Sequence, residues 1–235
     1  MKLGHRYLAA ANILIAVVGV FFWQRRSPPT GRGFIDEFDH GLDQWVVEQQ
    51  PGGTVRAAEG LLRLDDRDGC TVWFKPKLSA EPLIISYEAR VLSSGRVSDL
   101  NCFWLATDPK HPDLLAPQNR RDGKFASYDS LRTYYVGYGG NDNTTTRFRR
   151  YDGTGARPLR DEHDKRAPEF LLKPDYWYKI SLTVERNGRV TFNRDGEMIF
   201  DWHDPELLRE GWFGFRTVHS QIEIRHFRAS YGPLN

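Results

Sequence analysis

Hydrophobic and polar residues alternate along most of the chain from Phe34 onward, which is the pattern of strands with one buried face. Helical periodicity is absent over any long window, and Pro205 to Arg209 is the one short stretch that favours a helix. The pattern predicts strands at Gln44–Glu48, Thr54–Ala57, Leu61–Asp65, Thr71–Phe74, Leu83–Leu92, Leu100–Thr107, Leu131–Tyr138, Thr145–Tyr151, Tyr176–Arg186, Arg189–Arg194, Glu197–Asp201, Gly211–Thr217 and Ile222–Ser230.

Turn signals separate these strands at short intervals. Asn187-Gly188 and Asp195-Gly196 supply the positive φ that two-residue hairpins need, so they predict two successive hairpins. Many short antiparallel strands with closely spaced turns are typical of a sandwich or jelly roll. Because no internal repeat or second linker interrupts the pattern, we predict one all-β jelly-roll sandwich over residues 34–235.

Residues 7–23 form an apolar run in which Asn12 is the one clearly polar residue, and basic residues flank the run on both sides. The run is at the short end of the roughly 17–25 residues of a membrane-spanning helix. No small-residue cleavage site follows it, and Trp23 suits a membrane interface. We therefore expect residues 1–26 to form one N-terminal hydrophobic helix that acts as an uncleaved signal anchor, with a cleaved signal peptide as the alternative. Residues 27–33 would be a linker.

Either alternative exports the domain. A signal anchor would hold it at the membrane of the cell envelope, outside the cytoplasm, and a cleaved signal would leave it secreted or periplasmic. The membrane is therefore an expected partner of the N-terminal helix.

The formal net charge of +2 is unevenly distributed. The first 26 residues hold four of the 33 basic residues and no acidic one, so the remainder carries 29 basic against 31 acidic residues. A near-neutral domain lacks the basic stripe that nucleic-acid binding needs, so no nucleic-acid partner is expected.

Both cysteines, Cys70 and Cys102, lie in or beside strand-like runs. Buried free thiols are the simplest interpretation, because a free cysteine behaves as a small hydrophobic residue. A single disulfide is the alternative for an exported domain. Two cysteines without matching histidine spacing do not make a zinc site.

No cofactor is expected, and the metal signals are weak. Asp36 and Asp39 offer oxygen ligands of the kind that a structural Ca²⁺ prefers, although acidic residues near a strand start are common. His203 between Asp201 and Asp204 gives a fainter metal signal.

The segment from Ser98 to Tyr151 carries more Trp, Tyr, Asn and Arg on its predicted strands than a core requires. Aromatic rings stack on sugar rings, and planar guanidinium groups bind hydroxyls or carboxylates. Two long irregular segments, Asp108–Ser130 and Asp152–Pro174, flank these strands, and we expect them to form walls over one face. The candidate substrate-binding residues are Asn101, Trp104, Asp108, Tyr128, Asn141, Asn143 and Tyr151.

Some of these residues have structural interpretations. Trp104 suits a buried core equally well, and the stretch from Gly137 to Asn143 also has the composition of a simple turn after a strand.

Arg147 and Arg149 are two positions apart, so on a strand they point to the same face. Two adjacent guanidinium groups repel each other unless an anion lies between them. They are therefore a candidate clamp for a uronate carboxylate or a sulfate. The alternative is a pair of surface salt bridges with Asp161 and Glu162.

A lyase needs a cation that neutralises the uronate carboxylate and a Tyr or His base that removes the neighbouring proton. Tyr151 is a further proton-transfer candidate, and Asp108 and Asp129 are alternative acids or bases beside the long loop. Tyr134 and Tyr135 point to opposite faces, so one of them belongs to the core. The candidate catalytic residues are Tyr134, Arg147, Arg149 and His219, of which His219 also suits a structural role at a strand end.

Phe34–Trp45 and Glu59–Leu64 resemble the first strands of concanavalin A-like lectin/glucanase jelly rolls, and Trp177–Arg216 resembles the last strands. Tyr134–Gly137 and Thr145–Tyr151 resemble a bacterial family of unassigned function within this superfamily, whose members occur among polysaccharide-utilisation proteins. The resemblance implies a jelly roll and a carbohydrate ligand, but one fold hosts lectins, hydrolases and lyases. The Glu-x-Asp-x-x-Glu motif of retaining glucanases of this fold is absent from the sequence, which argues against their double displacement.

The sequence thus predicts an exported protein that binds an acidic polysaccharide and, if it is an enzyme, cleaves it as a lyase or by a glycoside cleavage unlike that of the glucanases. The alternatives are a non-catalytic carbohydrate-binding module and a structural envelope domain.

Overall fold

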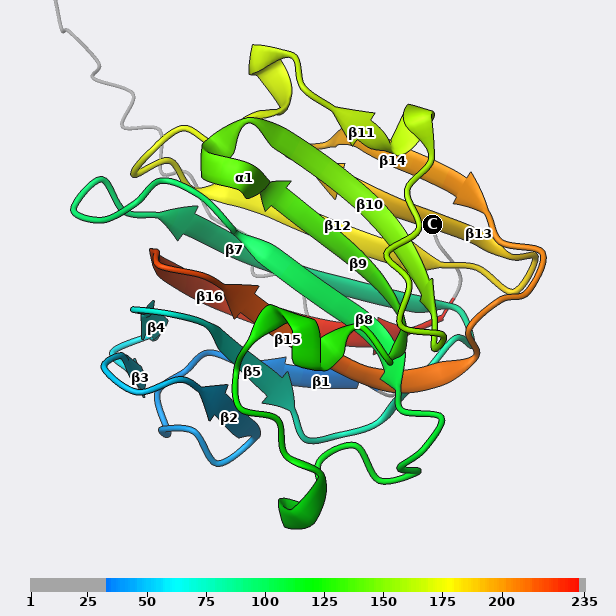
Figure 1. The fold of residues 1–235 in the computed structure, drawn as a ribbon, viewed down its shortest axis with the longest axis horizontal. Coiled ribbons are helices and arrows are strands. Elements are labelled where there is room, and N and C mark those ends of the chain that lie inside the picture. Colours follow the sequence, from blue (N-terminus) through cyan, green and yellow to red (C-terminus); the bar gives the residue numbers. More distant parts are fainter. Residues whose placement is uncertain (1–32, 233–235) are drawn as a thin grey trace, which may run out of the picture. The chain divides into compact units, whose positions relative to one another are not determined.

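Two eight-stranded antiparallel sheets face each other in the computed structural model, which describes residues 33–232 (Figure 1). The expected hydrophobic helix of residues 1–26 lies outside the described residues. Within the described part, no helix is long and apolar enough to cross a membrane. The all-β sandwich expected from the alternation pattern is confirmed.

The first sheet has β16 near its centre, where it pairs with β7, β4 and β1. The strands in order are β14 (Glu197–His203), β13 (Arg189–Arg194), β12 (Tyr178–Val184), β7 (Leu83–Val91), β16 (Gln221–Tyr231), β4 (Leu61–Asp65) and β3 (Thr54–Ala58), with β1 (Gly33–Asp36) beside β16.

The second sheet presents the face on which the candidate site lies. Its strands in order are β11 (Asp164–Lys165), β10 (Thr145–Asp152), β9 (Arg132–Gly139), β8 (Asn101–Thr107), β15 (Glu210–Thr217), β5 (Cys70–Phe74) and β2 (Trp45–Gln49), with β6 (Leu78–Ser79) beside β15. The short helices are η1 (Pro117–Asn119), η2 (Phe125–Tyr128), α1 (Gly140–Asn143), η3 (Asp161–His163) and η4 (Pro168–Phe170).

Every strand predicted from the alternation pattern is present, with ends that differ by a few residues at most. The pattern missed β1, β6 and β11, because two to four residues are too few to show an alternation. The helical tendency of Pro205 to Arg209 is not realised, since these residues form a turn and an extended connection.

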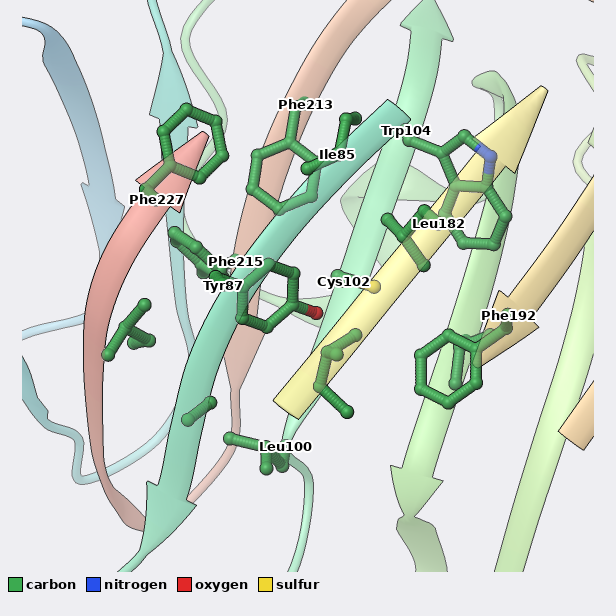
Figure 2. Packing of buried hydrophobic residues seen from close by; sticks show 14 of the residues in the cluster. Ile85, Tyr87, Leu100, Cys102, Trp104, Leu182, Phe192, Phe213, Phe215 and Phe227 are labelled. Atoms are coloured by element: carbon green, nitrogen blue, oxygen red, sulfur yellow. The ribbon is translucent and has the colours of Figure 1, made fainter. Parts of the chain in front are cut away.

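The main core lies between the sheets and follows from the alternation of side chains along each strand. β7 shows this most regularly, with every second residue from Leu83 to Val91 buried. Figure 2 shows Tyr87, Phe213 and Phe215 packed together in this core, with Cys102 beside the Tyr87 hydroxyl. Each large apolar side chain that is buried here stabilises the fold by roughly 1.5–3 kcal/mol.

Both cysteines are buried free thiols in this core, so the disulfide alternative is wrong. Burial raises the pKa of Cys102 to about 12 and that of Cys70 well above its ordinary value.

A second apolar cluster covers the outer face of the second sheet. The long loop that joins β8 to β9 lies over part of the second sheet (Figure 1). Its residues Leu114, Tyr128 and Leu131 pack in one cluster with Trp73 and Phe103 of the sheet. The rings of Trp73 and Phe103 stack with centroids 5.5 Å apart, and those of Phe103 and Tyr128 with centroids 5.6 Å apart. The loop therefore covers part of this face and leaves the rest accessible.

Candidate functional site

The strand register places a row of polar side chains across the outer face of the second sheet. Arg216 of β15 lies opposite Asn101 of β8, and Arg147 of β10 lies opposite Gly137 of β9. Because Cys102 pairs with Val136, the preceding Asn101 lies beside Gly137 in the same row. In the next row, Tyr135 lies opposite Arg149.

Gly137 makes a gap in this row that the Tyr135 ring fills. A Cβ placed on Gly137 would lie 3.1 Å from the Tyr135 hydroxyl oxygen, so the ring leans along the strand over the glycine. This orientation brings the phenol hydroxyl between the rows that hold Asn101, Arg147 and Arg149.

A pocket of about 310 Å³ opens above these residues. Asn101, Tyr135, Arg147 and Arg149 form its floor. Phe125 and Arg157 lie at one end of the floor, and Arg96, Asp99, Asn141 and Val218 lie at the other.

The guanidinium groups that line the pocket differ in their partners. Arg147 forms an ion pair with Asp164 at 2.8 Å. The salt-bridge alternative therefore holds for this residue, although the partner is Asp164 and neither Asp161 nor Glu162. Arg149 donates to the main-chain carbonyls of Arg157 and Pro158 at 2.5 and 3.1 Å, and it has no acidic partner among residues 33–232. The positive charge of Arg149 is therefore uncompensated.

Two further arginines, at the ends of the pocket, form ion pairs with aspartates. Arg157 forms a two-pronged ion pair with Asp129 at 2.7 and 2.8 Å, and this pair raises the pKa of Arg157. Arg96 bonds both Asp99 and Asp142 at 2.6 Å. The Arg157 end is therefore neutral, the Arg96 end carries one more negative than positive charge, and the positive charge of the pocket comes from Arg149 on its floor.

Asn101 supplies an unused acceptor. Its side chain is 3% exposed, and its Nδ2 donates to Asp99 Oδ1 at 3.1 Å. Its Oδ1 is buried without a hydrogen-bond partner in the described part of the chain. A buried polar atom without a partner costs about 1–3 kcal/mol, so a hydrogen bond to this oxygen would be favourable. Because the oxygen has almost no accessible surface, a ligand hydroxyl would reach it only after a shift of the neighbouring side chains.

The pKa of Tyr135 is raised well above its ordinary value, mainly because burial disfavours the phenolate. Tyr151 and Asp99 raise this pKa further, and Arg216 and Arg149 act in the opposite direction. Tyr135 therefore stays protonated at neutral pH, and its hydroxyl is available as a hydrogen-bond donor.

A left-handed turn forms the wall beside Asn141. Gly139 has φ of 66°, and Asn141, Asp142 and Asn143 have φ between 52° and 58°. Such a run is strained for residues other than glycine, and asparagine and aspartate tolerate it best. The Asn143 amide compensates by accepting from the Leu172 N–H at 2.8 Å and donating to the Leu172 carbonyl at 2.9 Å.

Of the candidate substrate-binding residues, the structure brings Asn101 and Asn141 to the pocket. Asn143 instead fixes the turn. Trp104 is completely buried between the sheets, beside Tyr134 and Phe148, so the core interpretation is correct and the stacking interpretation is wrong.

Three other candidates are buried beneath loops. Asp108 forms an ion pair with Arg121 at 2.6 Å, with both side chains nearly inaccessible. Tyr128 donates its hydroxyl to Glu48 at 2.9 Å. Tyr151 packs in the apolar cluster of the outer face, where burial raises its pKa to about 12.

The candidate catalytic residues are not brought together. Arg147 and Arg149 share the pocket, but Tyr134 points into the core on the other side of the sheet, where its hydroxyl donates to Asp204 at 2.5 Å. His219 does not line the pocket, and its Nε2 lies 3.7 Å from Asp68. Asp129 is occupied by its ion pair with Arg157.

The structure also places the weak metal candidates. Asp36 accepts hydrogen bonds from the Phe38 N–H at 2.7 Å and the Trp45 Nε1–H at 2.8 Å, so both of its oxygens serve the local turn. Asp39 is exposed. Within residues 33–232, no three His, Cys, Asp or Glu side chains lie close enough together to hold a metal ion, at His203 or elsewhere.

Sequence reasoning missed Tyr135, Phe125, Arg157 and Arg96. Tyr135 could have been predicted from the sequence. It points to the face opposite to that of Tyr134, and it lies two residues before Gly137, which is on the same face. The other three lie in irregular segments, where periodicity carries no information about direction.

No curated protein matches this sequence at a significant level. Among solved structures, a protein of unknown function with galectin-like fold from Bacillus subtilis is similar, with a TM-score of 0.64, 20% identity, and coverage of 84% of this chain and 94% of that chain. Carbohydrate-binding module CBM66 from Bacillus subtilis has a TM-score of 0.53 and 11% identity, with 80% and 95% of the two chains covered. The VIP36 exoplasmic/lumenal domain in its Ca²⁺/Man3GlcNAc-bound form has a TM-score of 0.59 and 14% identity, with 86% and 89% covered.

These similarities show a galectin-like jelly-roll fold, so the all-β jelly-roll sandwich predicted from the sequence is confirmed. The finer resemblance to concanavalin A-like proteins of polysaccharide utilisation stays a prediction. Residues 64–227 match the family described as Domain of unknown function (DUF6250). Since this match spans more than half of the chain, the protein belongs to the DUF6250 family.

Proposed function

We propose that this domain binds carbohydrate through the pocket on the outer face of β8, β9 and β10, and that the bound sugar carries an anionic group. One observation carries the proposal. Arg149, which has no acidic partner in the described residues, shares a pocket floor with the Tyr135 hydroxyl and the unpaired Asn101 Oδ1.

The chemistry of the floor matches an acidic sugar. The Arg149 guanidinium offers planar, paired donors to a carboxylate. Asn101 Oδ1 accepts a hydrogen bond from a sugar hydroxyl, and the Tyr135 hydroxyl donates one. The Phe125 ring at the pocket edge lies between the guanidinium groups of Arg157 and Arg216, 4.6 and 5.0 Å from its centroid, so its partly exposed edge is what it offers to a sugar ring.

The comparisons support a carbohydrate as the ligand. CBM66 is a carbohydrate-binding module, and the VIP36 domain was solved with a bound mannose-containing glycan. The identities are low, so the choice of an anionic sugar rests on Arg149 and its surroundings.

The geometry favours binding without cleavage. A lyase base must lose its proton near neutral pH, whereas the pKa values of Tyr134, Tyr135 and Tyr151 are all raised by burial. His219 lies outside the pocket lining. A non-catalytic binding domain is therefore our conclusion, and, from the sequence of residues 1–26 alone, we propose that it acts in the cell envelope.

Calorimetry with a glycan panel tests this function. The full chain in detergent would be titrated with polygalacturonate and alginate as acidic polymers and with dextran as a neutral one, while ultraviolet absorbance is followed for unsaturated uronate products. We expect binding to an acidic polymer, weaker binding to dextran, and no new absorbance. Preference for dextran would contradict the anionic ligand, and new absorbance would establish cleavage.

Two variants connect binding to the pocket. Arg149→Ala is expected to weaken binding about tenfold or more, because hydrogen bonds to charged groups contribute about 1.5–3 kcal/mol. Arg56→Ala is the matched control, since it removes an exposed positive charge from β3 on the other sheet. Equal loss in both variants would mean that only the overall charge matters and would contradict a site at Arg149.

A further inference from the structure

The loop from Asp108 to Leu131 closes one side of the pocket floor. At this side, the Gly123 carbonyl accepts a hydrogen bond from Arg216 at 3.0 Å, and the backbones of Gly123 and Gly69 approach so closely that neither has room for a Cβ. Arg216 is completely buried as a result. The polar row that begins at Arg147 is therefore accessible only as far as Asn101.

This covering loop is held by buried polar contacts. Glu48 accepts hydrogen bonds from Trp73 Nε1 at 2.8 Å, from the Tyr128 hydroxyl at 2.9 Å and from the Arg121 N–H at 2.9 Å. Arg121 in turn forms the buried ion pair with Asp108. Displacing the loop would leave these groups unpaired, which is costly, so the covered side stays closed.

A second wall stands at the end of the floor toward Tyr151. Here Arg157, from the loop after β10, bonds Asp129 and lies over the Phe125 ring, both from the loop before β9. These two contacts join the two loops. Arg149 fixes the same segment by its bonds to the carbonyls of Arg157 and Pro158.

A third wall stands at the opposite end of the strands. Arg96 bonds Asp99 and Asp142 at 2.6 Å and the Val218 carbonyl at 2.8 Å. It thereby joins the loop before β8, the left-handed turn and the loop after β15 into one barrier.

The three walls close three sides of the floor and leave one side open, the side across β10 where Arg147 pairs with Asp164 of β11. A polymer that passed through the site along the strands would have to cross both end walls. The volume of about 310 Å³ is also at the small end of the roughly 300–1,000 Å³ of small-molecule sites. We infer that the pocket takes the terminal residue of an acidic glycan chain, with the rest of the chain leaving over β10.

This inference rests on the proposed function and deepens it. The terminal sugar would place its carboxylate against Arg149 and a hydroxyl against Asn101 Oδ1. Internal residues of the same polymer would be excluded, because they extend in two directions and only one is open.

Counting sites against chain ends tests the inference. Polygalacturonate and alginate would each be shortened by partial acid hydrolysis, and the full chain would be titrated with equal masses of intact and shortened polymer. If each chain end forms one independent site, the number of sites per gram of polymer rises as the chains become shorter. For the polymer that binds, shortening the chains about tenfold should therefore raise the moles of protein bound per gram about tenfold. The dissociation constant per chain end should stay unchanged.

The outcomes are distinguishable. If the protein bound per gram of polymer stays constant or falls when the chains are shortened, the pocket binds sugars within the chain. That result would overturn the inference but leave carbohydrate binding in place. No binding by any sample would contradict the proposed function itself. Arg149→Ala should weaken the binding to chain ends about tenfold or more, and Arg56→Ala should leave it unchanged. Unchanged affinity in both variants would show that ends bind elsewhere.

Discussion

Two adjacent residues, Tyr134 and Tyr135, show how one position along a strand decides the role of a side chain. Tyr134 faces the core, where its hydroxyl donates to Asp204 and accepts from the Leu208 N–H at 3.1 Å. Tyr135 faces the pocket, opposite Arg149. Since alternate side chains along a strand point to opposite faces, the same phenol is structural at one position and available to a ligand at the next.

The two phenylalanine variants should therefore have opposite effects. Tyr134→Phe is expected to lower the free energy of unfolding by about 1–3 kcal/mol, because it removes one hydrogen bond from Asp204, which keeps Arg150 as a partner, and leaves the Leu208 N–H without its acceptor. Glycan affinity should not change. Tyr135→Phe should weaken glycan binding severalfold with little change in stability. Urea denaturation and calorimetry measure both quantities, and a binding loss in Tyr134→Phe would show that the core and the pocket are coupled.

The sequence identified part of the site at this scale. The spacing of Arg147 and Arg149 correctly placed both side chains on one face, because periodicity within a strand is local. It did not reveal that Asp164 neutralises Arg147, since that contact depends on the pairing of β10 with β11. Trp104 and Tyr134 were misassigned for a related reason, because the alternation shows which residues share a face but not which face is buried.

Among the elements, η3 lies at the edge of the sandwich where β11 and β14 are the edge strands of their sheets. Its His163 is buried with the ring edge-on to Phe148 of β10 and to Phe200 and Trp202 of β14. Burial lowers the pKa of His163, and Glu162 opposes this effect while Arg160 and Lys165 add to it. A short helix thus connects the two sheets through a neutral imidazole.

This arrangement makes stability depend on pH. The unfolded imidazole titrates near its ordinary value of about 6.5 and the folded one below it, so the unfolded chain binds more protons between the two pKa values. The free energy of unfolding should therefore fall as pH drops below about 6.5 and level off above that value. Thermal denaturation between pH 5 and 8 would measure this slope.

His163→Phe is the control variant for that measurement. The free energy of unfolding of this variant should change less steeply with pH than that of the natural protein. The other histidines are present in both proteins, so their contributions cancel in the difference. Equal slopes would mean that His163 does not titrate differently on folding.

At the scale of the whole molecule, the apolar core between the sheets isolates both thiols from solvent. Cys70 and Cys102 lie on β5 and β8, which are separated by β15, and each is almost completely inaccessible. Because the thiolate is the reactive form, raised pKa values and burial together make both groups unreactive in the folded protein.

A thiol reagent should therefore distinguish the folded from the unfolded chain. Native protein at pH 8 is expected to react negligibly with Ellman's reagent, and protein in denaturant should release two equivalents, one for each of its 2 cysteines. The melting temperature should be the same with and without reductant. A melting temperature that falls in reductant would contradict the free-thiol state.

The fold was more predictable than the site because it rests on a repeated signal. The alternation recurs in strand after strand, and turns such as Asn187-Gly188 mark where the chain reverses. The pocket walls depend on single contacts between segments far apart in the sequence, such as Arg157 with Asp129 and Arg96 with Val218. No local pattern encodes those contacts.

The position of β16 has a consequence for how the protein is made. This last described strand lies near the middle of its sheet, between β7 and β4, and also pairs with β1. Ribosomes add about 5–20 residues per second from the N-terminus, so β1 lacks its partner, and β4 lacks the partner on the side away from β3, until Gln221–Tyr231 has been synthesised. The first sheet is therefore expected to complete its pairing only once Gln221–Tyr231 has left the ribosome, and until then its exposed strand edges would depend on chaperones to avoid aggregation.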